Sequence, residues 1–218
     1  MKTMRRVFVD PAAPQSDAIH EAAKWILGGG VVALATDTLY GLAIDPFNRA
    51  AVTRLFEVKG READRAVPLI AADVPQIEEW IAGLTPVARR IAARYWPGPV
   101  TLLLPAPASL PPGVTGGRPT VGVRVPAHDV ARSICAACRR PITATSANVS
   151  GEPATADPDV VEQTLGARID LLIDTGPSAG GPPSTVVDAA GPPSLVRAGA
   201  VKWDEIQAWL NTEPGAHG

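Results

Sequence analysis

The sequence predicts an α/β fold, because short β-rich runs alternate with amphipathic helical stretches along the chain. Several helical stretches also carry their own start signal, a capping oxygen followed by proline, as at Thr85-Pro86 and Asp157-Pro158. The chain has 218 residues, of which 46% are hydrophobic and 19% charged, a composition typical of a globular domain with one core.

In chain order, the expected strands are short runs rich in Val, Ile and Leu. They are Arg5–Val9, Val31–Ala35, Val67–Ala71, Val100–Leu104, Val121–Val125, Ile142–Thr145, Leu171–Asp174, Thr185–Asp188 and Ser194–Arg197. The expected helices, which show apolar residues at helical spacing, are Ser16–Leu27, Asn48–Val58, Thr85–Tyr95, His128–Cys138, Asp157–Leu165 and Trp203–Leu210. The first helix is followed by three glycines, 28–30, which form a strong stop signal.

Length and charge limit the function classes. One domain is expected over residues 1–210, followed by a disordered tail over 211–218. The net charge of −2 gives no general attraction to nucleic acid or membrane, so any site for a polyanion must be local. No run of about eighteen apolar residues occurs, and the N-terminal apolar run is too short for a signal peptide. We therefore expect a cytoplasmic protein with no membrane partner.

Three further features of the sequence bear on the site. The only cysteines form the pair Cys135 and Cys138, which we interpret as small buried residues on one helix face, because no matching second ligand pair exists for zinc. No GxGxxG or GxxxxGK[ST] motif occurs, which disfavours the common nucleotide-binding folds. The Pro- and Gly-rich segments 105–119 and 176–183 are expected to be surface loops near a site.

The segment Pro141–Pro153 is the strongest local signal for a site. It reads PITATSANVSGEP, a strand-like start that breaks into hydroxyl groups, an amide and a glycine. Such residues form ordinary capped turns, and they also hold polar, phosphorylated ligands without many charges. The segment alone leaves both interpretations open.

Cations at the ends of elements favour the second interpretation. Lys59, Arg61 and Arg65 follow the second expected helix, where a solvated helix end is the ordinary explanation. Arg124 is different, because it lies between valines in an apolar strand and there needs an anionic partner. Arg197 repeats that situation in SLVRAG. These five cations, with no recognisable nucleophilic triad, suit a triphosphate bound beside a small carboxylate.

Seven segments together resemble the YrdC-type family of L-threonylcarbamoyladenylate synthases, in the family's order. They are ATDTLYGLAIDPFN (35–48), KGREADRAVPLI (59–70), WPGPVTLLLP (96–105), TVGVRVPAH (120–128), TATSANVSGEPA (143–154), DTGPSAGGPPSTVVD (174–188) and LVRAGAV (195–201). The resemblance spans nearly the whole chain, in the pattern of the short, single-domain members. It implies a single twisted mixed β-sheet with flanking helices around a large concave cavity.

The resemblance also implies a reaction. L-threonine, bicarbonate and ATP would condense to threonylcarbamoyl-AMP and pyrophosphate, which supplies the t6A modification of tRNA. A carbamate of threonine would attack the α-phosphorus in line with departing pyrophosphate, so no protein nucleophile is needed. Mg²⁺ is expected with ATP, and a downstream threonylcarbamoyl transferase complex is the expected protein partner. Weak tRNA binding stays open.

Carried over position by position, the resemblance assigns the site residues by role. The proposed catalytic groups are Lys59, Arg61 and Arg124; the ATP contacts are Lys59, Arg61, Thr120, Ser146, Asn148 and Arg197; the amino-acid contacts are Thr36, Arg124, Ala144 and Ser184. No metal ligand is assigned, although Asp37 and Asp174 are the carboxylates considered for Mg²⁺.

Two departures from the family pattern concern the amino-acid substrate. Ala72 stands where many members carry a histidine that touches threonine, and Pro183 stands where many carry an acidic residue. They leave two alternatives open: a YrdC-like paralogue that acts on another carbamoyl adenylate, and an RNA-binding module. The negative net charge and an aromatic content of 5% argue against the second.

Overall fold

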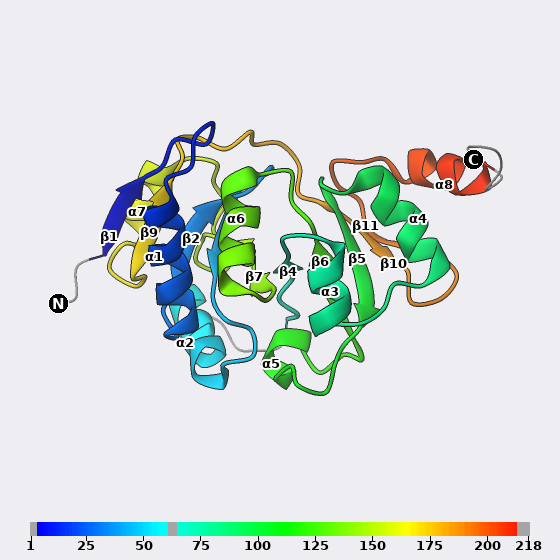
Figure 1. Cartoon of the computed structure of the whole chain (residues 1–218), viewed down its shortest axis with the longest axis horizontal. Coiled ribbons are helices and arrows are strands. Elements are labelled where there is room, and N and C mark those ends of the chain that lie inside the picture. Colours follow the sequence, from blue (N-terminus) through cyan, green and yellow to red (C-terminus); the bar gives the residue numbers. More distant parts are fainter. Residues whose placement is uncertain (1–3, 61–64, 213–218) are drawn as a thin grey trace.

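The computed structural model describes residues 4–60 and 65–212. Its strands form two mixed sheets that lie side by side, with the two ends of the chain at opposite ends of the molecule (Figure 1). The α/β class expected from the sequence is therefore confirmed.

The first sheet has the strand order β1-β9-β2-β3-β8. Its members are β1 (Arg5–Phe8), β2 (Val32–Ala35), β3 (Tyr40–Ala43), β8 (Thr145–Ser146) and β9 (Leu171–Asp174). β9 pairs in parallel with β1 and β2, whereas β3 pairs antiparallel with β2 and β8. β2, β3 and β9 are buried throughout, as expected for central strands with both faces covered.

Helices cover the two faces of the first sheet. α1 (Ser16–Leu27) and α6 (Asp129–Cys138) pack side by side on one face, and α2 (Arg49–Lys59) and α7 (Pro158–Leu165) pack on the other. Cys135 and Cys138 are free and buried on α6, which confirms the packing interpretation. Burial raises the pKa of the Cys138 thiol to about 12.

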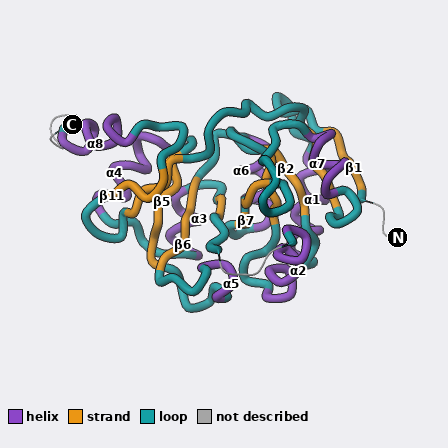
Figure 2. Tube along the Cα trace, turned by 180° about the vertical axis from the view of Figure 1, so that it is seen from behind, coloured by secondary structure: helices purple, strands orange, loops and turns teal. Residues whose placement is uncertain are grey.

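The second sheet has the order β11-β10-β5-β6-β4-β7. Its members are β4 (Leu69–Ile70), β5 (Val100–Pro105), β6 (Thr120–Arg124), β7 (Ile142–Thr143), β10 (Thr185–Asp188) and β11 (Ser194–Arg197). α3 (Val74–Trp80) and α4 (Pro86–Tyr95) lie beside this sheet, and α8 (Trp203–Asn211) packs on α4 (Figures 1 and 2). α5 (Pro112–Thr115) connects β5 to β6.

The expectation of a single sheet is corrected to two, and the reason lies in the segment 142–146. β7 belongs to the second sheet and β8 to the first, with only Ala144 between them. The Ala144 N–H donates to the carbonyl of Pro68 at 2.9 Å, beside the second sheet, while the Thr143 N–H donates to Ile44 at 3.2 Å, beside the first. The chain therefore crosses from one sheet to the other within one residue, and the sheets meet there.

Three elements were not expected from the sequence. β3 is absent from the expected strands, yet Gly41 is a buried strand residue opposite Leu34. α3 begins at a capping Asp73, whose carboxylate accepts the N–H of Gln76 at 2.9 Å. α5 is a single turn inside the Pro-rich segment, and it begins at a proline as helices often do.

The last helix, α8, ends at Asn211, and the domain boundary at 210 stays a prediction. The expected tail lies mostly outside the described residues. Among the helices of residues 4–60 and 65–212, none is long and apolar enough to cross a membrane.

Candidate active site

A cavity of about 410 Å³ lies where the two sheets meet. This volume is within the range of small-molecule sites. The first sheet contributes the segment after β2 and the start of β3, the second contributes β4, β5 and the end of β6, and the crossing at Ala144 forms the wall between them. The polar side chains that line it are Thr36, Thr38, Tyr40, Arg65, Thr101, Arg124, Thr145, Ser146, Ser184 and Arg197.

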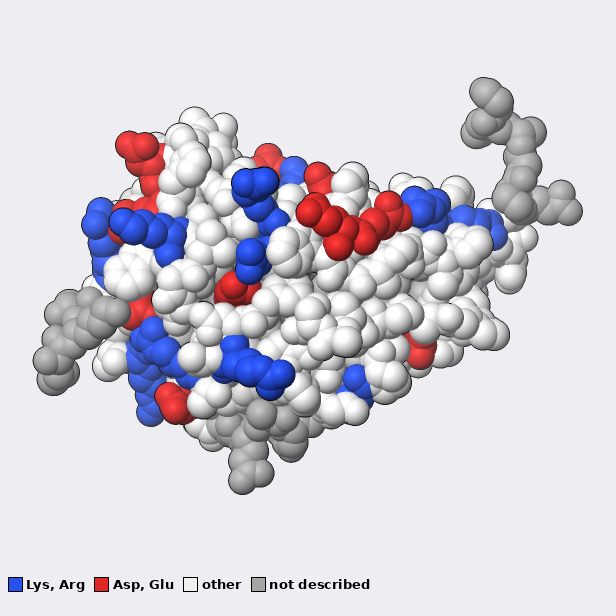
Figure 3. All heavy atoms as spheres, turned by 60° about the horizontal axis from the view of Figure 1, so that its bottom comes forward, with Lys and Arg blue, Asp and Glu red and all other residues white. Residues whose placement is uncertain are grey.

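The charge of this cavity has one sign. Arg65, Arg124 and Arg197 line it, whereas no Asp or Glu is found among its described lining residues. The outer face shown in Figure 3 is different, because basic and acidic side chains are interspersed over it. Three arginines with no acidic side chain among the described lining residues favour an anionic ligand in the cavity.

Strand alternation aims Arg124 into the cavity. Val121 and Val123 of β6 pack into the core, so Gly122 and Arg124 face the other side of the sheet. Arg124 is 7% exposed, and its Nη1 donates to Asp37 Oδ1 at 2.8 Å. Burial lowers the pKa of Arg124 and Asp37 opposes that shift, but an arginine remains charged at neutral pH.

A second group of polar side chains lies on neighbouring strands. Arg197 of β11 donates through Nη2 to the carbonyl of Ser184 at 2.8 Å, and the Ser184 hydroxyl is 2.8 Å from Thr101 Oγ1. Partial desolvation lowers the pKa of Arg197. Thr101, Ser184 and Arg197 therefore form one hydrogen-bonded edge of the cavity.

A buried lysine side chain holds the turn that follows β8. Lys59, the last residue of α2, is 2% exposed, and its Nζ donates to the carbonyls of Ser146 at 2.6 Å and Asn148 at 3.0 Å. The Asn148 amide donates within the same turn, to Val149 and Glu152, and Asn148 Oδ1 accepts the Ser146 hydroxyl at 2.5 Å. This turn is therefore rigid, and it presents Ser146 to the cavity.

The hairpin loop between β2 and β3 forms the neighbouring part of the wall. Thr36 and Thr38 are nearly buried, and Thr36 Oγ1 donates to the carbonyl of Leu39 at 2.8 Å. The Tyr40 hydroxyl donates to the carbonyl of Gly176 at 2.7 Å, so β3 holds the start of the 176–183 segment. Gly180 and Ser178 of that segment bond the Thr38 carbonyl, which places the segment beside the cavity as expected.

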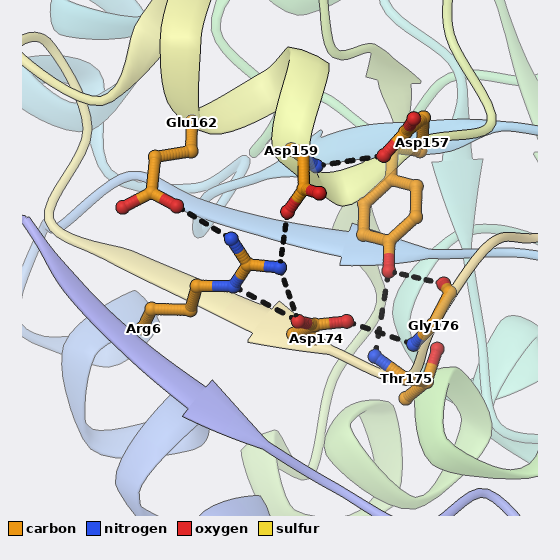
Figure 4. Close-up of polar contacts among 8 residues, drawn as sticks. Arg6, Asp157, Asp159, Glu162, Asp174, Thr175 and Gly176 are labelled. Carbon is orange, nitrogen blue, oxygen red and sulfur yellow. Dashed lines mark hydrogen bonds and ion pairs between the residues drawn. The ribbon is translucent and has the colours of Figure 1, made fainter.

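A salt-bridge cluster anchors this wall from outside the cavity (Figure 4). Arg6 on β1 donates to Asp174 Oδ2 at 2.6 Å and also contacts Asp159 and Glu162 of α7. Asp174 Oδ1 in turn accepts the N–H of Gly176 at 2.8 Å, the residue that also accepts the Tyr40 hydroxyl. Asp174 is thus occupied in holding the loop, and it does not line the cavity.

The structure brings most of the expected site residues together. Thr36, Arg124, Ala144, Ser146, Ser184 and Arg197 line the cavity. Lys59 and Asn148 lie directly behind it and bond within the turn, so their direct contact with ATP stays a prediction. Arg61 is outside the described residues.

Thr120 is an expected site residue that lies away from the cavity, at the other end of β6 from Arg124. It is on the same face of β6 as Arg124 but four residues away, opposite Pro105, which corresponds to about 13 Å along a strand. It is not among the lining residues, and its role stays a prediction.

Sequence reasoning missed Thr101 as part of the site, and it considered Asp37 only as a ligand for Mg²⁺. Thr101 interrupts the apolar run of β5, and its alternation with Val100 and Leu102 would have placed it on the Arg124 face. Asp37 carried no signal as the partner of Arg124, because 87 residues separate them. Within the described residues, no three His, Cys, Asp or Glu side chains gather as a metal site.

Comparison with known proteins agrees with this architecture. The family model Sua5/yciO/yrdC, with the description "Telomere recombination", matches residues 24–199. A protein of Pyrococcus abyssi named threonylcarbamoyl-AMP synthase is 40% identical over 190 residues, which cover 87% of this chain and 56% of that protein. A protein of the same name from Thiobacillus denitrificans is 40% identical over 162 residues, which cover 74% of this chain and 86% of that protein.

The crystal structure of P. abyssi Sua5 complexed with L-threonine superposes with a TM-score of 0.88 and 36% identity, over 95% of this chain and 61% of that one. The chain thus spans less than two thirds of the Pyrococcus protein. The family model nevertheless covers every strand from β2 to β11 and all the described residues that line the cavity. The chain therefore belongs to the Sua5/yciO/yrdC family.

Proposed function

We propose that the chain is an L-threonylcarbamoyladenylate synthase. L-threonine, bicarbonate and ATP would give threonylcarbamoyl-AMP, pyrophosphate and water, and the product would serve t6A synthesis on tRNA. The relatives named threonylcarbamoyl-AMP synthase support this reaction, and the threonine-bound Pyrococcus structure supports the amino acid.

The observation that carries the proposal is the electropositive cavity between the sheets. Three arginines and no described carboxylate line it, next to a turn rich in hydroxyl groups. Such a site neutralises two anions, a triphosphate and an amino-acid carboxylate or carbamate. A single cavity would therefore hold both reactants close enough to react.

The residues divide between the two substrates. We assign the threonine carboxylate or carbamate to Arg124, beside Thr36 and the Ala144 backbone, because Arg124 is the most buried of the three arginines. We assign ATP to Ser146 and Arg197, which present a hydroxyl group and a guanidinium to the cavity from the first and the second sheet. Ser184, bonded to Arg197, would lie between the two substrates.

The proposed chemistry depends on position and charge. The carbamate oxygen attacks the α-phosphorus, the bond from that phosphorus to the bridging oxygen of pyrophosphate breaks, and the arginines balance the charge that develops on pyrophosphate. The described lining residues include no Cys, His, Asp or Glu that would act as a nucleophile in this step.

Mg²⁺ remains a proposal as the ion that accompanies ATP. The described lining residues offer it no carboxylate, so the protein side chains of the cavity do not form a site for the ion. Phosphate oxygens and water are the ligands that Mg²⁺ commonly keeps when it is bound through a nucleotide. The roles assigned to the arginines do not depend on it.

The other expected partners are proposals of the same kind. Bicarbonate would enter as the carbon source, and a threonylcarbamoyl transferase complex would take the adenylate to tRNA. Direct tRNA binding is expected to be weak, because the net charge of −2 gives no general attraction to a polyanion.

The test is direct detection of the adenylate. The purified chain is incubated with L-threonine, bicarbonate, Mg²⁺ and ATP, and the product is identified by mass spectrometry while pyrophosphate is measured. We expect pyrophosphate only when threonine and bicarbonate are both present. Release that does not depend on threonine, or the absence of the adenylate, would contradict the proposal.

A further inference from the structure

We infer that Asp37 is a positioning residue, which fixes the guanidinium of Arg124 so that its remaining N–H groups are presented to the amino-acid substrate. The inference rests on the proposed function, because it concerns how the same cavity holds that substrate. Neither the carboxylate nor its pairing with Arg124 was assigned a role in the reaction above.

The first argument is the geometry of the contact. Arg124 Nη1 donates to Asp37 Oδ1 at 2.8 Å. Among the described residues, this carboxylate is the one hydrogen-bond acceptor that contacts the guanidinium. A guanidinium carries five N–H donors. A contact through one of them restrains the position of the group and leaves the others for a ligand in the cavity that Arg124 lines.

The second argument is the free oxygen of Asp37. Asp37 Oδ2 is buried and has no hydrogen-bond partner in the described part of the chain. An Arg–carboxylate pair that served only stability would be expected to be bidentate, with both oxygens on the guanidinium. The single contact keeps one edge of Arg124 unoccupied at the cost of an unsatisfied carboxylate oxygen.

The third argument is that the loop carrying Asp37 is itself fixed. The Thr36 hydroxyl donates to the carbonyl of Leu39, and the N–H of Thr36 donates to that same carbonyl at 3.2 Å. The Thr38 carbonyl accepts hydrogen bonds from the Ser178 hydroxyl and the Gly180 N–H. Asp37 therefore projects from a rigid loop of the first sheet onto an arginine of the second, and it defines the position of Arg124 across the junction.

The charges around Arg124 explain why its guanidinium needs a partner that holds it in place. Arg124 and Arg197 repel each other across the cavity, and the burial of Arg124 disfavours its charge. Asp37 opposes both effects and keeps Arg124 charged and in place before the substrate arrives. A preorganised cation binds an anion without the cost of reordering a long side chain.

The test compares Asp37→Asn with a matched control, Asp45→Asn. Asp45 is also nearly buried and pairs with an arginine, Arg140, at 3.0 Å, but it does not line the cavity. We measure L-threonine binding by calorimetry, KM for L-threonine and for ATP, and the melting temperature. For Asp37→Asn we expect at least a tenfold loss in L-threonine affinity and a KM for ATP within twofold of the parent. For Asp45→Asn we expect both constants to stay within twofold.

Two further variants distinguish positioning from a general structural role. Asp37→Glu, which keeps the charge, should recover part of the lost threonine affinity. In an Arg124→Lys background, Asp37→Asn should weaken threonine binding less than it does in the parent, because the group it positions has already been changed. Full additivity, or an equal rise in both KM values, would overturn the inference.

The outcomes also separate this inference from the proposed function. If the parent chain forms the adenylate and Asp37→Asn behaves as Asp45→Asn does, the inference alone is wrong. If the parent forms no adenylate but binds L-threonine, and Asp37→Asn abolishes that binding, the proposed reaction fails while Asp37 keeps its positioning role.

Discussion

Single residues carry the charge that defines the site, and the clearest of them was visible in the sequence. Arg124 lies between valines, so a buried strand had to place its charge against an anion or a carboxylate. The structure supplies both a carboxylate, Asp37, and a cavity. What the sequence did not reveal was the identity of the partner, because contacts between distant loops follow from tertiary packing.

Ser146 is the residue through which the turn is predicted to touch ATP. Replacing it with alanine should weaken ATP binding by about 1 kcal/mol, roughly fivefold, because one hydroxyl contact is lost. The measurement is calorimetric titration with ATP. Ser150→Ala is the control in the same turn, since the Ser150 hydroxyl is buried and has no partner among the described residues. Equal effects of the two substitutions would return Ser146 to a turn-capping role.

Tyr40 gives a prediction of pH dependence. Burial raises the pKa of its hydroxyl to about 12, whereas a tyrosine in the unfolded chain titrates near 10. Between these values the unfolded state loses a proton that the folded state retains, so this contribution to stability is complete below pH 10 and is lost as the pH rises toward 12. The free energy of unfolding in urea should therefore fall more steeply between pH 9.5 and 11.5 in the parent than in Tyr40→Phe. Parallel curves would show that Tyr40 does not titrate as proposed.

Among the secondary-structure elements, those with strong local signals were predictable. The capped helices that begin near Thr85 and Asp157 were expected within one residue, because a capping side chain and a proline fix a helix start locally. β3 and α3 were missed. β3 is a strand because of its neighbours β2 and β8, and the 2-residue strands β4, β7 and β8 are likewise defined by pairing with distant strands of their own sheets.

Lys59 links α2 to the turn after β8, so its removal should loosen both. We expect Lys59→Met to destabilise the fold by at least about 2 kcal/mol, because charge-assisted hydrogen bonds from a buried ammonium to two partly buried carbonyls are lost. Lys24→Met is a matched control, since Lys24 also lies in the last turn of a helix but is exposed. Urea denaturation compares the two. A loss no larger than that of the control would mean that Lys59 does not support the turn.

Gly199 permits the close approach of two segments at the cavity edge. A Cβ atom there would lie 2.3 Å from the carbonyl oxygen of Pro183 and 2.4 Å from the Ser184 carbonyl carbon, far inside contact distance. Gly199→Ala should therefore displace Ser184 and Arg197, lowering the melting temperature and raising KM for ATP together. Gly191→Ala, where nothing lies within 4 Å of the added atom, should change neither. An unchanged KM for ATP in Gly199→Ala would mean that this edge of the cavity does not bind the nucleotide.

At the scale of the whole molecule, the site exists because two sheets meet. The sequence indicated an α/β domain and, through the family resemblance, a cavity, but it did not show that the strands divide between two sheets. The division depends on the crossing at Ala144, where one residue leaves the pairing of β7 and enters that of β8. No residue type specifies such a crossing locally, because Ala144 itself is compatible with either sheet.

The central claim is that the junction of the sheets holds ATP and an amino acid in one cavity, through arginines of the second sheet. A crystal structure of the chain with L-threonine and ATP, or an unreactive ATP analogue, tests this directly. We predict that the threonine carboxylate lies within hydrogen-bond distance of Arg124 and the triphosphate beside Ser146 and Arg197. Both ligands bound outside this cavity, for example in the groove between α3 and α6, would contradict the account.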